Sequence, residues 1–299
     1  MWEAAQSLPR GLSRWVLAVR PATLPAAVAP VLVGSATAAH LSAFHLPAAL
    51  ASLWVALWLQ IGTNLANDVY DFLHGSDPPH RLGPPRVTAT GLLSPRHVLL
   101  GAYAAFGLAA LGGLYLVALR GWILVLVGGT CVLAGLLYTA GPFPLGYRGL
   151  GDLLVFVFFG LVAVVGTDYV QTGVLRVRPV AAAIPVGFLC TAILVVNNLR
   201  DLETDRATGK RTLAVRLGRT GTRLEYLLCL VGTFAAPAWM RAAGWLGEFY
   251  WLPWLGLPWA ASLAHFVWTH EGAALNHALR GTARLHLVHA ALLGVALLV

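Results

Sequence analysis

Residues 46–77 read LPAALASLWVALWLQIGTNLANDVYDFLHGSD, an apolar run that ends in a cluster of acids. The apolar part is long enough for a membrane-spanning α-helix, which needs about 20 mainly apolar residues. Carboxylates are costly beside hydrocarbon, so acids at the end of such a helix indicate a function. This stretch therefore predicts a membrane span that carries a polar site at one end.

Comparable apolar stretches recur along the whole chain. Its 299 residues are 58% hydrophobic and 11% charged, whereas a soluble domain is about 25% charged. We therefore expect an all-α integral membrane protein that forms a single domain over residues 1–299. Nine spans are predicted, at about 22–43, 46–70, 98–119, 121–140, 151–173, 179–198, 222–240, 246–268 and 283–299.

Residues 1–20 have the pattern of a helix that lies in the membrane interface. Trp15 and Val19 fall on one helical face, and Arg10 and Arg14 fall on the other. The alternative is that these residues form the first turns of the first span.

The net charge of +8 does not indicate a nucleic-acid partner, because the basic residues are distributed by topology. With the N-terminus inside, sixteen of the 20 Lys and Arg residues fall in inner segments, and the other four are Arg120, Arg176, Arg178 and Arg241. Such an excess is typical of cytoplasmic loops. We expect a multi-pass protein of the cell (inner) membrane, surrounded by lipid, whose N-terminus and long polar loops are cytoplasmic.

Two short windows, 68–77 and 201–205, hold half of the 12 Asp and Glu residues. Asn64, just before the first window, is four and seven residues from Asp68 and Asp71, so the three side chains share one side of a helix. Asn197, just before the second window, forms a similar stripe with Asp201 and Asp205. The two clusters lie at corresponding places in the chain, which suggests two pseudo-repeats at about 21–140 and 151–268 around a central site.

Two carboxylate stripes that face one cavity require a cation between them. Oxygen ligands without His or Cys favour Mg²⁺, which binds one or two carboxylates, waters and substrate phosphates. Basic residues follow both stripes and could bind a diphosphate: Arg81, Arg86, Arg206, Lys210 and Arg211. The alternative is that both clusters are solvated helix ends with a few ion pairs.

The acidic motifs resemble the two signature motifs of the UbiA prenyltransferase superfamily. They are NDxxDxxxxxD (Asn67, Asp68, Asp71 and Asp77) and NNxRDxxxD (Asn197, Asn198, Arg200, Asp201 and Asp205). The wider text NLANDVYDFLHGSD, RLGPPR, YTAGPFPLGYRGLGD and NNLRDLETDRATGKRTLAVRLG is similar to the 1,4-dihydroxy-2-naphthoate polyprenyltransferases. The similarity covers residues 20–220.

The resemblance implies about nine helices in two bundles around a central cavity, open to lipid and capped on the cytoplasmic side. It implies Mg²⁺-dependent transfer of a polyprenyl group from polyprenyl diphosphate to 1,4-dihydroxy-2-naphthoate, with decarboxylation. By this resemblance the catalytic metal ligands are Asp68, Asp71, Asp201 and Asp205, and Tyr138 lies near the allylic carbon. The substrate-binding residues are then Asn64, Asn67, Asp77, Arg81, Arg86, Asn197, Asn198, Lys210 and Arg211.

Other functions share some of these features. Related enzymes prenylate 4-hydroxybenzoate, homogentisate, a porphyrin or a lipid phosphate, and the acidic motifs do not separate these acceptors. A cation-coupled transporter is a further alternative, but its acids should lie near mid-span. Asp168, in the expected fifth span, is predicted to be a solvated interfacial carboxylate and not a catalytic base.

Overall fold

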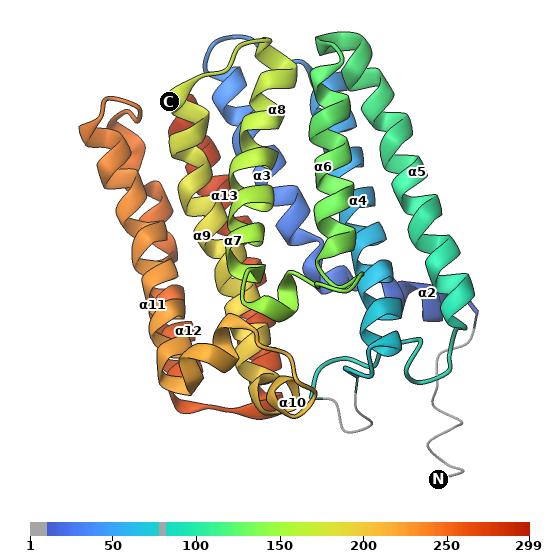
Figure 1. Cartoon of the computed structure of the whole chain (residues 1–299). Coiled ribbons are helices and arrows are strands. Elements are labelled where there is room, and N and C mark those ends of the chain that lie inside the picture. Colours follow the sequence, from blue (N-terminus) through green and yellow to red (C-terminus); the bar gives the residue numbers. More distant parts are fainter. Residues whose placement is uncertain (1–10, 78–81) are drawn as a thin grey trace.

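The computed structural model describes residues 11–77 and 82–299, and these residues form helices and loops without a β-strand. Most of the long helices run side by side as one bundle (Figure 1). In chain order the helices are α2 (Leu12–Val19), η1 (Pro21–Thr23), α3 (Pro25–Ala39), α4 (Leu46–Leu73), α5 (Pro95–Arg120), α6 (Ile123–Leu137), η2 (Gly146–Arg148), α7 (Gly151–Val155), η3 (Phe156–Val162), α8 (Ala163–Thr172), α9 (Val177–Arg200), α10 (Leu202–Ala207), α11 (Leu213–Ala242), η4 (Glu248–Gly256), α12 (Leu257–Thr269), η5 (Gly272–Ala274) and α13 (Leu275–Leu298).

The membrane class predicted from the sequence is confirmed. Five helices of the described residues are long and apolar enough to cross a bilayer, and a sixth span results if the helices from Leu12 to Ala39, bent by 50°, count as one. The other three predicted ranges hold helices that do not meet this standard. Helix α6 has 15 residues and α12 has 13, and the first turns of α11 contain several arginines. By length and composition the count is therefore five to six, and nine complete crossings stay a prediction.

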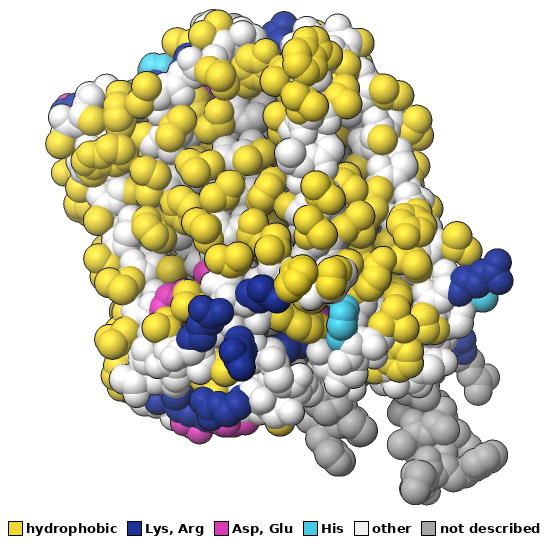
Figure 2. Space-filling view, viewed as in Figure 1, with side chains coloured by type: hydrophobic (Ala, Val, Ile, Leu, Met, Phe, Trp, Pro, Cys, Tyr) yellow, Lys and Arg dark blue, Asp and Glu magenta, His cyan; other side chains and the backbone are white. Residues whose placement is uncertain are grey.

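The outer surface of the bundle suits a lipid environment. Hydrophobic side chains cover its middle, whereas most charged side chains in view gather near one end (Figure 2). On α11, Leu228 and Val231 are 68% and 64% exposed. A water-facing apolar surface of this extent would promote aggregation, so contact with acyl chains is the physical reason that it is tolerated.

Helix α9 is the most buried of the long apolar helices, with 72% of its apolar window inside the protein. It packs against α11, α13 and the π-helical segment η3. Glycines allow the closest of these contacts, because a Cβ on Gly160 would lie 2.7 Å from the Cα of Gly187. The middle of α9 is thereby packed directly against η3.

We call the end of the bundle that holds Asp71 and Asp201 the acidic end, and the opposite end the far end. At the far end Asp168 is 1% exposed and pairs with Arg176. Its carboxylate also accepts a hydrogen bond of 2.8 Å from Thr37 Oγ1. The prediction of a solvated Asp168 was therefore wrong, since partners from α3 and the α8–α9 loop enclose it.

We expect Asp168→Asn to destabilise the protein by about 3–5 kcal/mol, because it leaves the Arg176 charge without its buried partner. The readout is the apparent melting temperature in detergent. Glu248→Gln is the matched control, since it breaks the exposed Arg241–Glu248 pair at 3.1 Å, which should contribute at most about 1 kcal/mol. Equal melting temperatures for the two variants would contradict the structural role of Asp168.

Candidate functional site

A cavity of about 990 Å³ extends through the bundle, and α3, α4, α5, α6, η3, α8 and α9 contribute to its walls. Toward the far end its walls are apolar and include Leu116, Leu124 and Val170. At the acidic end its walls are polar. Ten of the predicted site residues line it there: Asn64, Asn67, Asp71, Arg86, Tyr138, Asn197, Asn198, Asp201, Asp205 and Lys210.

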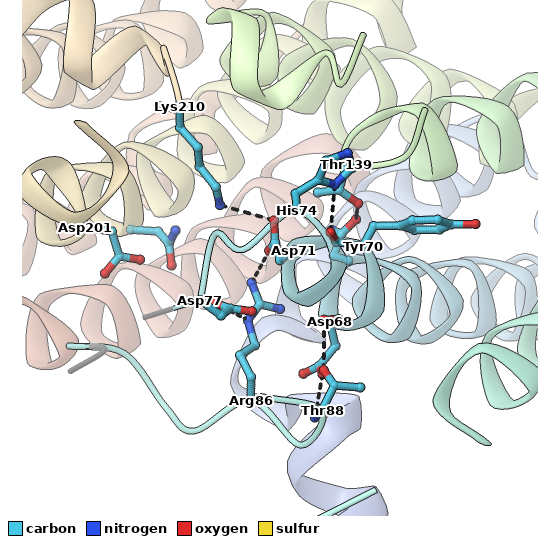
Figure 3. A network of polar contacts seen from close by, with 12 residues as sticks. Asp68, Tyr70, Asp71, His74, Asp77, Arg86, Thr88, Thr139, Asp201 and Lys210 are labelled. Carbon is cyan, nitrogen blue, oxygen red and sulfur yellow. Dashed lines mark hydrogen bonds and ion pairs between the residues drawn. The ribbon is translucent and has the colours of Figure 1, made fainter. Parts of the chain in front are cut away.

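Asp71, in the last turn of α4, lies at the centre of the polar network (Figure 3). Its Oδ2 accepts from Arg86 Nη2 at 2.6 Å, and its Oδ1 accepts from Lys210 Nζ at 3.2 Å. The Tyr147 hydroxyl donates a third hydrogen bond, of 2.5 Å, to Oδ1. One carboxylate thus holds together two cations from loops that are far apart in the sequence.

Tyr147 supports this arrangement. Burial and the neighbouring Asp71 carboxylate raise the pKa of its hydroxyl above the ordinary value, so the hydroxyl stays protonated and keeps donating to Asp71. The Lys210 ammonium lies 4.5 Å from the centre of the Tyr147 ring, a cation–π contact. Tyr147 therefore positions both members of the Asp71–Lys210 pair.

Asp201, where α9 meets α10, is held by the preceding residue. Arg200 is 3% exposed and donates two hydrogen bonds to the Asp201 carboxylate, at 2.8 and 2.5 Å. The same guanidinium donates to Asn197 Oδ1 at 2.9 Å and to Asn276 Oδ1 at 2.8 Å. Such a fork fixes the orientation of the carboxylate and of the last turn of α9.

The loop before Arg86 closes over this cluster. Asn276 donates to the Leu82 carbonyl at 2.8 Å. A Cβ on Gly83 would lie 2.8 Å from Arg200 Nη2, so glycine allows the loop to pass directly against the guanidinium. The two halves of the chain therefore meet at the acidic end.

Asp68 points away from the cavity. Its Oδ1 accepts hydrogen bonds from the backbone N–H and the hydroxyl of Thr88, and its Oδ2 lies 3.9 Å from Arg20 Nη2. It is 1% exposed and does not line the cavity. In Figure 3 Asp68 and Thr88 lie on the opposite side of α4's end from Lys210.

The remaining predicted residues also differ in placement. Asp77 lies 3.5 Å from Arg86 Nε and is absent from the cavity wall. Arg211 has an exposed side chain, while its backbone N–H donates to the Tyr147 carbonyl at 2.8 Å. Arg81 lies outside the described residues.

Sequence reasoning missed a second polar patch on the cavity wall. Asn64 donates to Thr23 Oγ1 at 2.9 Å, Gln60 donates to the same hydroxyl at 3.2 Å, and Arg20 lines the cavity beside them. Arg20 has φ 56°, a left-handed conformation that is strained for a residue other than glycine. Such strain is found most often at functional sites, but the sequence does not reveal it.

The donor set at the acidic end fits Mg²⁺. Asp71 from α4 and the pair Asp201 and Asp205 from the α9–α10 junction face the same cavity. Among the described residues no three His, Cys, Asp or Glu side chains form a compact metal cage. Mg²⁺ does not need one, since it binds through one or two carboxylates and completes its shell with water and phosphate oxygens.

Comparison with known sequences assigns this architecture to a family. Residues 27–296 match the model of the UbiA prenyltransferase family. A Mycobacterium tuberculosis protein named 1,4-dihydroxy-2-naphthoate octaprenyltransferase is 46% identical over 252 residues, covering 78% of this chain and 85% of that protein. An Escherichia coli protein of the same name is 38% identical over 259 residues, covering 85% and 84%.

Solved structures agree on the fold. A UbiA homolog from Aeropyrum pernix superposes with a TM-score of 0.70 at 17% identity, covering 96% of this chain and 98% of that one. A UbiA homolog from Archaeoglobus fulgidus, bound to DMAPP and Mg²⁺, gives a TM-score of 0.69 at 16% identity and covers 95% and 99%. The UbiA-like fold expected from the sequence motifs is thus confirmed.

Proposed function

Because the chain belongs to the UbiA prenyltransferase family, we propose that it transfers a polyprenyl group to 1,4-dihydroxy-2-naphthoate in menaquinone synthesis. The donor is a polyprenyl diphosphate. The reaction releases diphosphate and CO₂ and gives demethylmenaquinol, which oxidises to demethylmenaquinone. Relatives with 35–46% identity over most of the chain are named for this acceptor, which supports it. The main structural support for prenyl transfer is the shape and lining of the cavity. It is apolar along most of its length and ends at Asp71, Asp201 and Lys210.

The acidic end suits the diphosphate. Asp71, Asp201 and Asp205 would hold Mg²⁺, which supplies charge neutralisation for the departing diphosphate when it is bound. Arg86 and Lys210, both within 3.2 Å of Asp71, can donate to phosphate oxygens that the metal leaves free. Asp68 does not line the cavity and its Oδ1 is bonded to Thr88, so its side chain would have to turn toward the cavity, with Oδ2 as the ligand atom, to join the metal ligands.

The apolar part of the cavity suits the prenyl tail. Its walls keep water from the allylic cation that forms when the C–O bond breaks. The Tyr138 ring lines the cavity where the apolar and polar parts meet. A Cβ on Gly151 would lie 2.9 Å from the Tyr138 hydroxyl, so this glycine makes room for the tyrosine.

The patch around Arg20 suits the acceptor. A guanidinium beside amide and hydroxyl groups can bind a carboxylate and phenolic oxygens, which are the polar groups of dihydroxynaphthoate. The side chain of Arg20 is 24% exposed, and its Nη2 lies 3.9 Å from Asp68. We propose that Arg20, with Thr23 and Gln60, orients the ring toward the prenyl carbon.

We expect Arg20→Gln to raise KM for dihydroxynaphthoate about 10–100-fold, the usual value of a hydrogen bond to a charged group. KM for the prenyl diphosphate should change little. The control is Arg14→Gln, whose guanidinium donates to the Leu92 carbonyl and does not line the cavity. A rise in KM for the diphosphate instead of the acceptor would refute this placement.

Glycines widen the cavity on the side of α5. Gly113 lines the cavity, and a Cβ added there would meet no protein atom within 4 Å. Gly107, on the same helix, also has open space around it but is exposed and absent from the cavity wall. The two positions therefore test whether the tail occupies the cavity.

We expect Gly113→Phe to lower the rate with octaprenyl diphosphate about tenfold or more, because forcing atoms into filled space costs about 1–3 kcal/mol. Geranyl diphosphate should still react, since its short tail ends before Gly113. Gly107→Phe should leave both rates unchanged. Loss of both donors in Gly113→Phe, with normal expression and melting temperature, would argue against a tail along α5.

The acceptor is tested by offering purified protein, Mg²⁺ and octaprenyl diphosphate with dihydroxynaphthoate, 4-hydroxybenzoate or homogentisate in separate reactions. Mass spectrometry should detect a prenylated product only with dihydroxynaphthoate. A product with one of the other acceptors alone would support prenyltransferase activity but refute dihydroxynaphthoate as the acceptor.

We also propose an orientation in the membrane. From the excess of Lys and Arg in the inner segments, the acidic end and the N-terminus face the cytoplasmic side of the cell membrane.

A further inference from the structure

A second pocket, of about 330 Å³, lies at the far end of the bundle. It is formed where α3 ends, α9 begins and α11 and α13 end, and its lining includes His40, Arg178, Arg241 and Trp245. The proposed prenyl transfer uses none of these residues. Figure 2 shows basic and histidine side chains along this edge, apart from the larger basic group at the acidic end.

Arg178 is only partly satisfied by the protein. Its Nη2 donates to the Leu297 carbonyl at 3.0 Å, while its buried Nε has no hydrogen-bond partner among the described residues. The two neighbouring arginines have acidic partners, Arg176 with Asp168 and Arg241 with Glu248. No such pair involves Arg178 in the described part of the chain.

The surroundings of Arg178 are mainly positive, and the opposing charge is the Asp168 carboxylate, which is already paired with Arg176. Helix α9 begins at Val177 without a side-chain cap and without an acid in its first turn. A helix N-terminus carries a partial positive charge, so it favours an anion and disfavours the cations present here. Burial and the charges of Arg178 and Arg176 also lower the pKa of His40. These features together favour an anionic group in the pocket.

Tryptophans indicate where this pocket lies relative to the lipid. Trp245 lines the pocket, and its ring meets that of Trp239 edge to face at 5.1 Å. Trp239 is 47% exposed on the apolar outer surface of α11. Exposed tryptophans beside arginines mark the level of lipid headgroups.

We propose that this far-end pocket binds a phosphate group, supplied by the headgroup of an anionic phospholipid in the adjoining leaflet. Arg178 would donate to the phosphate oxygens, and Arg241 would join it by sharing the guanidinium that now pairs with the exposed Glu248. The acyl chains would lie on the apolar face of α11. The site is independent of the proposed prenyl transfer and would stand if that proposal failed.

The test is native mass spectrometry of detergent-purified protein titrated with phosphatidylglycerol or phosphatidylcholine. Both lipids carry the phosphate, but the choline ammonium of phosphatidylcholine cancels its charge, whereas phosphatidylglycerol keeps a net negative charge that attracts the two arginines. Wild type should therefore retain phosphatidylglycerol about tenfold more tightly than phosphatidylcholine, a difference of about 1.4 kcal/mol. The double variant Arg178→Gln with Arg241→Gln should lose this preference. Arg206→Gln with Arg219→Gln removes the same charge at the acidic end and should keep it.

Unchanged phosphatidylglycerol binding in the far-end double variant would overturn the proposal. In a separate experiment inorganic phosphate is added at the same concentration as phosphatidylglycerol. If it displaces the lipid, the pocket binds free phosphate and not a lipid headgroup, which would overturn the proposal. The melting temperature of the double variant without lipid shows whether it folds. If it does not fold, Arg178→Lys keeps the charge but loses the guanidinium Nε–H and fork, and it should still weaken the lipid preference.

Discussion

Replacing Asp71 by Asn is expected to lower prenyl transfer by about 10²–10³-fold, the usual loss when one group that stabilises developing charge is removed. The reason is its central position. Asp71 contacts Arg86, Lys210 and Tyr147 within 3.2 Å and faces the cavity that also holds Asp201. A neutral amide would weaken the metal site and release both cations. The measurement is kcat with saturating octaprenyl diphosphate, dihydroxynaphthoate and Mg²⁺.

Glu203→Gln is the matched control for Asp71→Asn. Glu203 belongs to the second acidic window but is 60% exposed and pairs with Arg206 and Arg219 outside the cavity. Its replacement should change kcat by less than about twofold, because exposed ion pairs contribute at most about 1 kcal/mol. A comparable loss in both variants would show that general charge, and not the position of Asp71, sustains activity.

Arg200→Met is expected to be the most destabilising single substitution at the acidic end. It would leave the buried Asp201 carboxylate without its bidentate partner and also remove the bonds to Asn197 and Asn276. Removing one member of a buried pair costs about 3–5 kcal/mol. The apparent melting temperature should fall strongly, and transfer activity should fall with it.

Arg206→Met provides the comparison for Arg200→Met, because Arg206 pairs with Glu203 at 3.0 Å on the surface. Both substitutions remove one positive charge from the same segment. The melting temperature of Arg206→Met should stay near that of wild type. If Arg200→Met also melted near wild type, the Arg200 fork would not hold the end of α9 in place.

Apolar stretches predicted the helices well, because membrane helices must satisfy their backbone internally and hide their polar groups. The ends of α4 and α9 were likewise found from their acids. The sequence did not show that Asp71 lines the cavity whereas Asp68 does not. Three residues along a helix rotate the side chain by about 300°, so the two carboxylates point about 60° apart. That difference sends Asp71 into the cavity and Asp68 toward Thr88.

Contacts between distant segments set the other limits. Asp168 is enclosed by Thr37, which lies 131 residues earlier in the chain, and no local pattern reveals such a partner. Arg200 stood inside the second motif, but its fork became visible only once Asn276 and the 82–86 loop were placed beside it. Residue type and spacing indicate the chemistry, whereas the assignment of each partner needs the folded chain.

The central claim is that the acidic end of the cavity binds Mg²⁺ and a prenyl diphosphate and releases diphosphate as the prenyl group is transferred. The most direct measurement follows both products, diphosphate and prenylated naphthoquinone, from purified protein in liposomes with and without Mg²⁺. We predict equal amounts of the two products, formed only with Mg²⁺ and lost in Asp71→Asn. Product formation that continues in EDTA, or that persists in Asp71→Asn, would contradict the account.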